Sequence, residues 1–202
     1  MIAEDDVIHI ELIKRELDAC IDTAKHISGH VVDRKDLHAR DDLERFINVL
    51  MGEVAEQMVI KWLKEQGKFA ESAVDKISNK PDMGHDIKVI RTNGNELLLC
   101  SVKSSLSYKL DVQGILNICK IASKKSELRD INVQVYFWLT LNPKDNGNRL
   151  TVPSLRQAAI IGWFGRNDLL KFAAYNHEEG REAPIETLNG GRTMSSLLTL
   201  LS

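Results

Sequence analysis

The chain has 202 residues, of which 43% are hydrophobic and 28% charged, the balance of a globular domain large enough to bury a core. Its net charge of -2 excludes a protein that binds polyanions through overall positive charge. No apolar run approaches the roughly 20 residues of a membrane helix, so we expect no membrane association. The acidic N-terminus is unlike a secretory signal, and three widely spaced cysteines favour a reducing compartment, which predicts a cytoplasmic protein.

The first 65 residues are expected to be mostly helical. Apolar residues at three- and four-residue spacing predict an amphipathic helix over 4–27 and a longer helix over 40–65, which Gly67 would end. The stretch 68–85 has no period and ends in a turn-rich segment. We therefore expect residues 1–40 to form an N-terminal helical arm and residues 41–202 to form one domain.

The rest of the chain alternates between strands and helices. Two short apolar runs, 86–90 and 96–103, flank Asn93-Gly94, a dipeptide typical of a tight β-hairpin. The remaining predicted elements are a helix over 107–127, strands over 131–141 and 157–164, a short helix over 168–174, a loop over 176–192 and a closing helix over 193–201. The helix before residue 131 allows a parallel crossover. The order predicts an α/β fold with a mixed central β-sheet flanked by helices.

The hairpin brings polar residues together at one end. If Asn93 and Gly94 form a two-residue type I′ turn, Asp86 lies opposite Ser101 and diagonal to Lys103, on one face of the sheet. The other face would carry only apolar residues and would belong to the core. Those apolar residues are Ile87, Val89, Leu98, Cys100 and Val102. A simple ion pair between Asp86 and Lys103 is the alternative to a functional site.

These residues also resemble a known motif. The segment Gly84-His85-Asp86-Ile87, followed by the hairpin and by Ser101-Val102-Lys103, resembles the signature of the PD-(D/E)xK nuclease superfamily, which includes many restriction endonucleases. A preceding helix that carries Glu53 also matches, and the resemblance covers roughly residues 45–172. It implies a restriction-endonuclease-like core and a Mg²⁺-dependent endonuclease, with Mn²⁺ able to substitute. The substrate would be DNA.

The resemblance assigns a role to each residue of the motif. Asp86 would be the central metal ligand, the backbone carbonyl of Val102 a second ligand, and Glu53 a third ligand or the partner of a metal-bound water. Lys103 would orient or deprotonate the attacking water, or neutralise the phosphate. Such residues suit phosphodiester hydrolysis because a hard cation held by one or two carboxylates stabilises the charge that develops on phosphorus.

One position departs from the family pattern. The residue two before the lysine is usually Glu or Asp, and here it is Ser101, which brings no charge to a metal. We expect Glu53 to compensate first and Asp111 second. Glu127 also lies near the following helix, but neither Asp111 nor Glu127 has the spacing of S-x-K restriction enzymes. The departure leaves open a degenerate protein that keeps the fold, no longer cuts, and binds nucleic acid or a partner protein.

Contacts with the DNA backbone are expected after the motif. A basic strip with few acidic residues runs from Lys103 to Arg129, and within it Lys109, Gln113 and Lys120 are the candidate DNA contacts. The alternative for these residues is a solvated helix face. We expect a restriction or defence setting and a homodimer, which would place two sites across a duplex. A third hypothesis is an α/β protein whose motif is accidental and which has no metal site.

Overall fold

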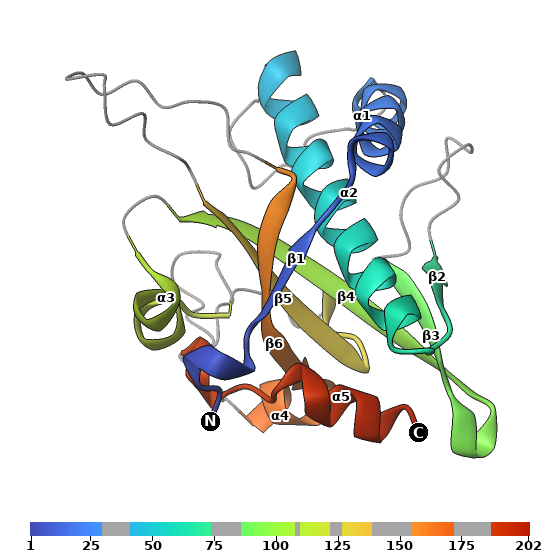
Figure 1. Ribbon diagram of the computed structural model, residues 1–202, viewed down its shortest axis with the longest axis vertical. Helices are drawn as coiled ribbons and strands as arrows, with labels where there is room; N and C mark the ends of the chain where they lie inside the picture. The colour runs from blue at the N-terminus through green and yellow to red at the C-terminus, as the bar shows by residue number, and fades with distance from the viewer. Residues whose placement is uncertain (30–40, 74–85, 108–109, 122–126, 139–154, 172–186) are drawn as a thin grey trace.

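A six-stranded mixed sheet runs through the molecule in the order β1-β6-β5-β4-β3-β2 (Figure 1). The computed structural model describes residues 1–29, 41–73, 86–107, 110–121, 127–138, 155–171 and 187–202. The strands are β1 (Ile8–Glu11), β2 (Ala70–Ser72), β3 (Ile87–Arg91), β4 (Glu96–Ser107), β5 (Ile131–Trp138) and β6 (Gln157–Gly165). The helices are α1 (Lys14–Ser28), α2 (Asp42–Glu65), α3 (Val112–Ile118), α4 (Arg166–Lys171) and α5 (Met194–Leu200), with short 3-10 turns η1 (Glu4–Asp6), η2 (Thr92–Gly94) and η4 (Leu188–Gly190).

The pairing of the strands confirms the predicted fold class. Strands β4 and β5 are parallel, and every other neighbouring pair is antiparallel. A parallel pair needs a crossover connection, and α3 lies in the segment between β4 and β5. The structure is therefore a mixed α/β sheet with helices packed against it.

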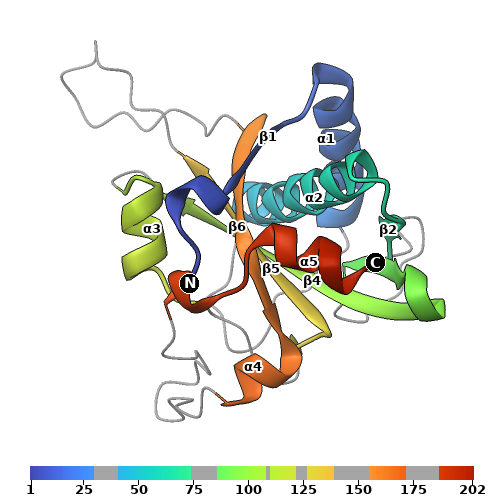
Figure 2. The same cartoon turned by 60° about the horizontal axis from the view of Figure 1, so that its bottom comes forward.

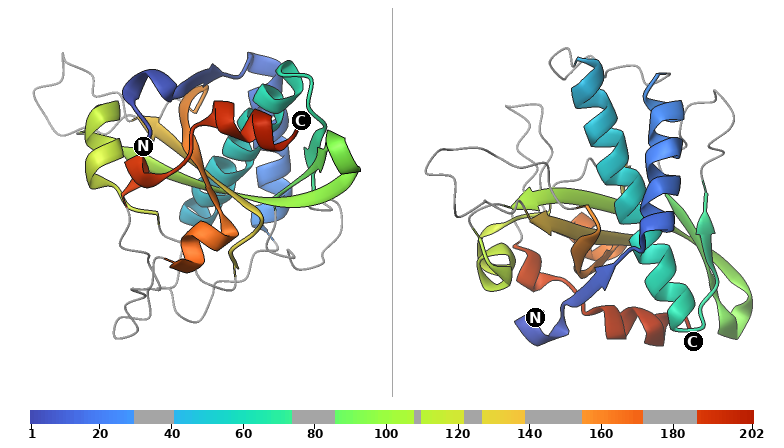
Figure 3. Two further views of the ribbon diagram at one scale, coloured as in Figure 1. Left: turned by 90° about the horizontal axis from the view of Figure 1, so that it is seen from below. Right: turned by 45° about the horizontal axis from the view of Figure 1, so that its top comes forward.

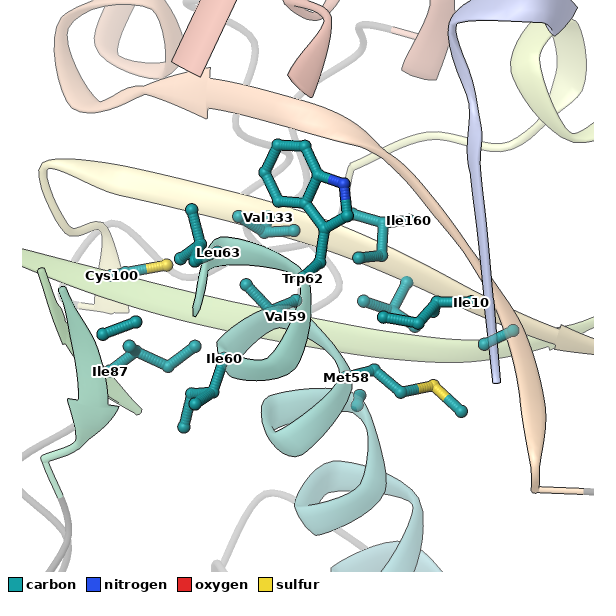
Figure 4. Close-up of a cluster of buried hydrophobic side chains, with 14 of the residues drawn as sticks. Ile10, Met58, Val59, Ile60, Trp62, Leu63, Ile87, Cys100, Val133 and Ile160 are labelled. Atoms are coloured by element: carbon teal, nitrogen blue, oxygen red, sulfur yellow. The ribbon is translucent and has the colours of Figure 1, made fainter. Parts of the chain in front are cut away.

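Helices α1 and α2 lie side by side on one face of the sheet (Figure 3). Helix α2 begins where the Asp41 carboxylate accepts a hydrogen bond from the Glu44 amide at 2.7 Å. It ends at Glu65, and Gly67 stops it as predicted, because this glycine has a φ of 70° and lets the Lys68 amide reach the Leu63 carbonyl at 2.9 Å. Figure 4 shows the buried side of α2 packed on strands β1 and β3–β6.

A second, smaller core lies on the opposite face of the sheet. There α3 packs with the 3-10 turns η1 and η4 and with the chain start, and the Ile2 amide donates to the Asn189 carbonyl at 2.8 Å. Figure 2 shows the N-terminus lying close to α5 at this end of the molecule. Because both faces are covered in this way, residues 131–137 of β5 are all buried, whereas the longer β4 keeps several part-exposed residues.

The hairpin has the predicted register but a different turn. Strand β3 pairs with β4 from Ile87 opposite Cys100 to Arg91 opposite Glu96, as expected. A type I′ turn needs positive φ at both Asn93 and Gly94. Instead the chain makes a 3-10 turn over 92–94, and Asn95 alone has positive φ, at 51°. The longer loop preserves the register because it adds one residue to each side of the expected turn.

Three other predictions need correction. Residues 8–11 form strand β1 rather than part of a helix over 4–27, because Ile8 and Ile10 alternate with polar residues and pair with β6. Helix α3 ends at Ile118 rather than near 127, since Cys119 is extended. Strand β2 lies in a stretch predicted to be irregular. The boundary at residue 40 stays a prediction, because 30–40 lie outside the described residues.

Two glycines make a matched test of packing. A Cβ on Gly162, in β6, would lie 2.6 Å from the Arg192 carbonyl oxygen, whereas a Cβ on Gly52, in α2, would meet nothing within 4 Å. We expect G162A to lower the free energy of unfolding by about 1–3 kcal/mol because backbone must shift. We expect G52A to raise it by about 0.5–1 kcal/mol because alanine favours a helix. Urea unfolding checks both, and a neutral G162A would contradict the packing.

An ion pair between α1 and α2 gives a pH-dependent prediction. The Glu16 carboxylate accepts from Lys61 Nζ at 2.9 Å and from the Ile13 amide at 2.8 Å. Burial raises the pKa of Glu16, but these hydrogen bonds and the charges of Lys61 and Arg15 outweigh it, so the pKa lies below its ordinary 4.5. A lowered pKa stabilises the fold above pH 4.5, and this stability is lost as the pH falls through the folded-state value.

We therefore expect E16Q to lower the free energy of unfolding at pH 7 by less than about 1 kcal/mol, since the pair is partly exposed. The difference from the parent should shrink at pH 3. Urea unfolding at both pH values measures it, and an equal difference at pH 3 and pH 7 would show that the charge of Glu16 is not the cause.

Candidate functional site

Asp86 ties the start of β3 to both neighbouring strands. Its amide donates to the Cys100 carbonyl at 2.9 Å, and its carbonyl accepts from the Ala73 amide at 2.9 Å. Its carboxylate accepts a hydrogen bond from the Val102 amide at 2.5 Å. The side chain of Asp86 thus lies beside β4. It bonds to a backbone group of β4 that lies beyond Cys100, the last residue of β4 paired with β3.

The same geometry places the Val102 carbonyl beside Asp86. In a strand, the amide and the carbonyl of one residue point toward the same neighbouring strand. Because the Val102 amide points at the Asp86 carboxylate, its carbonyl points to this edge as well. Asp86 and the carbonyl of Val102, the two metal ligands that the motif predicts at this point, therefore lie next to each other.

Lys103 lies one residue further along β4 and forms an ion pair with Glu127. Its Nζ is 2.9 Å from Glu127 Oε2, and the two side chains are 32% and 26% exposed. Ser101 lies on the same face as Lys103, two residues before it, and is 2% exposed. The core face of the hairpin is apolar, as predicted, with Ile87 and Cys100 both buried there. The described residues bring Glu127 to Lys103, although the sequence ranked Glu127 below Glu53 and Asp111.

Helix α2 contributes two buried glutamates, and they lie in different surroundings. Glu53, the predicted ligand, is 7% exposed, accepts a long hydrogen bond of 3.5 Å from Gln57, and lines a cavity of about 750 Å³ between α1, α2 and Ser72. Glu56 is 6% exposed and lies close enough to Cys100 to act on its thiol. The sequence signal for Glu56 was its place three residues after Glu53, on the apolar side of α2.

The Cys100 thiol reports on the charge around this corner of the sheet. Burial raises its pKa well above the ordinary 9.0, and the negative charges of Asp86 and Glu56 raise it further. Both carboxylates therefore act on the same buried point beside β4, one from the start of β3 and the other from α2. Glu53 lines the cavity that reaches Ser72, which pairs with Ile87 next to Asp86, so both α2 glutamates point to this part of the sheet.

The other predicted contacts are scattered. Asp111 caps α3 by accepting from the Gly114 amide at 2.8 Å, so its carboxylate serves the helix rather than Lys103. Gln113 on α3 and Lys120 just after it are exposed. Lys109 and His85 lie outside the described residues. Within the described ranges, no group of three His, Cys, Asp or Glu side chains is placed to hold a metal ion.

A row of polar side chains crosses β4 and β5 on the face that carries Lys103. The parallel register pairs Ser101 with Asn132, Lys103 with Gln134, and Ser105 with Tyr136. Asn132 and Gln134 are 1% and 4% exposed. This row was not predicted from the sequence, although β5 carries a signal for it. A strand covered on both faces is expected to be apolar throughout, and here polar residues alternate with apolar ones.

Most of the row is satisfied internally. The Asn132 carboxamide accepts from the Arg129 amide at 3.1 Å and donates to the Arg129 carbonyl at 2.7 Å and to that of Phe164 at 3.3 Å. Burial raises the pKa of Tyr136, and a hydrogen bond with Cys119 raises it further, while a bond with Ser105 lowers it. In contrast, the buried Nε2 of Gln134 has no hydrogen-bond partner in the part of the chain that the structure describes.

Comparison of the chain with protein-family models, with curated proteins and with solved structures finds no match. Among the helices described, none is both long enough and apolar enough to cross a membrane. The case for a function therefore rests on the geometry of the residues above.

The surroundings of Cys100 give a labelling test. We expect iodoacetamide at pH 8 to modify Cys119, which is partly exposed, and to leave Cys100 unmodified, since its thiol is buried and its raised pKa keeps it protonated. Cys100 should react only after unfolding in urea. Peptide mass spectrometry measures both sites, and equal labelling of Cys100 and Cys119 in the native protein would contradict the packing at this corner.

Proposed function

We propose that the protein is a metal-dependent endonuclease that hydrolyses phosphodiester bonds of DNA. One observation carries the proposal: the Asp86 carboxylate and the Val102 backbone lie together at the point where β3 begins, with Lys103 next along β4. This is the arrangement that the PD-(D/E)xK resemblance requires of a hairpin. Membership of the chain in this family is itself part of what we propose.

The donors at this point fit a magnesium ion. Mg²⁺ prefers oxygen ligands and commonly keeps several waters while one or two carboxylates hold it. Asp86 and the carbonyl of Val102 would supply two oxygens, and a buried glutamate of α2, Glu53 as the motif implies or Glu56, would add a third through a water. When bound, the ion would stabilise the negative charge that develops on phosphorus. Mn²⁺ would substitute.

Lys103 and Glu127 would manage the attacking water. Lys103 would orient the water through its ammonium group, and Glu127 would hold that ammonium in place, since the two already lie 2.9 Å apart. The water oxygen would bond to phosphorus, one phosphorus–oxygen ester bond would break, and the departing oxygen would take up a proton. Glu127 thus places an acidic group beside Lys103, whereas the motif position two residues before the lysine is the uncharged Ser101.

The alternative is a protein that keeps this arrangement and binds nucleic acid or a protein without cutting. Ser101 and the engagement of Lys103 by Glu127 favour it, because both leave less charge for a metal and a substrate. Incubation with plasmid DNA in Mg²⁺ or Mn²⁺ distinguishes the two functions. A binder retards the DNA in a gel and leaves it intact, whereas the endonuclease nicks or linearises it.

The central test is mutation of the two motif residues. We expect D86N and K103M each to reduce plasmid cleavage in Mg²⁺ by about 100-fold or more, because they remove the metal ligand and the group next to the water. Asp18 and Lys171 are exposed residues of α1 and α4, so D18N and K171M are matched controls. Circular dichroism should show that all four variants fold. Full activity in D86N or K103M would overturn the mechanism.

The setting and the assembly belong to the same proposal. A restriction or defence role and a homodimer would follow from cutting both strands, since a twofold axis places two sites across a duplex. Gln113, on the exposed side of α3, and Lys120, just after the helix, would contact phosphates. Analytical ultracentrifugation with and without duplex DNA would measure the assembly.

A further inference from the structure

Lys103 and Gln134 form the middle pair of the polar row, and the hydrogen bonding of Gln134 differs from that of Asn132 and Tyr136 on either side. Asn132 satisfies its carboxamide within the protein, and Tyr136 bonds to Ser105 and Cys119. Between them Gln134 is 4% exposed, and its Nε2 donor has no partner among the residues described. A buried donor without an acceptor is costly, and in native proteins such an exception calls for an explanation.

The place of Gln134 indicates what the missing acceptor is. It pairs with Lys103 in the β4–β5 register, so the two side chains leave the same face from neighbouring strands, roughly 5 Å apart at the backbone. Beside the amide, therefore, lies a primary amine whose charge attracts anions. An acceptor that suits an ammonium and an amide donor together is an oxygen of an anion, and phosphate offers several such oxygens.

We propose that Lys103 and Gln134 together bind a non-bridging oxygen of a phosphate group, with Gln134 as a binding residue that recognises the substrate. The inference rests on the proposed function for the identity of that phosphate as the scissile group of DNA. The phosphate exchanges with Glu127 as the partner of Lys103, because the flexible stem of a lysine lets its amine move between acceptors. Gln134 then gains the acceptor that it lacks in the free protein.

Inorganic phosphate is the first probe, and the side-chain amide of Gln134 is the reporter. In ¹⁵N-labelled full-length protein, the Gln134 amide signals are assigned by their loss in Q134L. We expect these signals to shift saturably as phosphate is added, and the shift to disappear in K103M. Gln157 is an exposed glutamine of β6 whose amide donates to Glu11, so its signals serve as the internal control and Q157L as the matched variant.

Stability and cleavage complete the test. Because Q134L removes an unsatisfied donor, we expect its melting temperature to equal or exceed that of the parent, while its cleavage of plasmid DNA falls about tenfold, the effect of losing one hydrogen bond to a charged group. Q157L should retain full cleavage. A clear fall in the melting temperature of Q134L would mean that the amide has a structural partner, and would overturn the inference.

The outcomes separate the two proposals. A phosphate-induced shift without any DNA cleavage would support the phosphate site and overturn the nuclease. Cleavage that depends on Asp86, with no shift at Gln134 and full activity in Q134L, would support the nuclease and overturn the role of Gln134. Absence of both effects would overturn both.

Discussion

The hydrogen bond from the Val102 amide to the Asp86 carboxylate is the contact on which the candidate site depends. Strand β4 is longer than β3, so its backbone groups beyond Cys100 need acceptors and donors that β3 does not supply. Asp86 provides one acceptor with its side chain, at 2.5 Å. A carboxylate that completes a sheet edge in this way is fixed in position, which is what a metal ligand or a recognition group requires.

The two faces of the sheet carry different kinds of side chain. The face under α1 and α2 holds the larger apolar core, with Glu53 and Glu56 buried at its margin. The other face carries the polar row, whose middle residue Lys103 pairs with Glu127, and the second apolar core beneath α3. Polar side chains on central strands weaken a core unless they are satisfied. Asn132 meets this condition within the protein, and Gln134 does not, which separates a structural residue from a candidate binding residue.

Much of the hairpin could be predicted from the sequence, because its register follows from alternation. A shift by one residue would expose Ile87 and bury Lys88, so the pattern selects one alignment. The turn could not be predicted as well, since Asn93-Gly94 fits several loop lengths. Strand β1 was missed because Ile10 also continues the three- and four-residue spacing of Ile13, Leu17 and Ile21, and pairing with β6 decides for a strand. The register of a hairpin follows from neighbouring residues in the sequence, whereas an edge strand such as β1 forms only against a strand that is distant in the sequence.

The candidate site was predicted in part for the same reason. Asp86, Val102 and Lys103 lie on paired strands, so their proximity follows from the register. Glu127 and Gln134 reach Lys103 only through the crossover to β5, whose alignment nothing in the linear sequence fixes. Likewise, helical spacing marks both Glu53 and Glu56 as flanking the apolar stripe, but it does not say which one faces Cys100.

Burial explains why an uncharged residue suits position 101, while the acidic partner of Lys103 is Glu127. Ser101 is 2% exposed and lies beside Asn132, whose own carboxamide is already satisfied. A carboxylate there would lose its hydration without a positive partner, at a cost of several kcal/mol. Glu127 keeps about a quarter of its side chain in solvent and meets the Lys103 amine directly, so its charge is less costly to hold. The negative charge beside Lys103 therefore lies at Glu127, where both its partner and water reach it, and the buried position 101 stays uncharged.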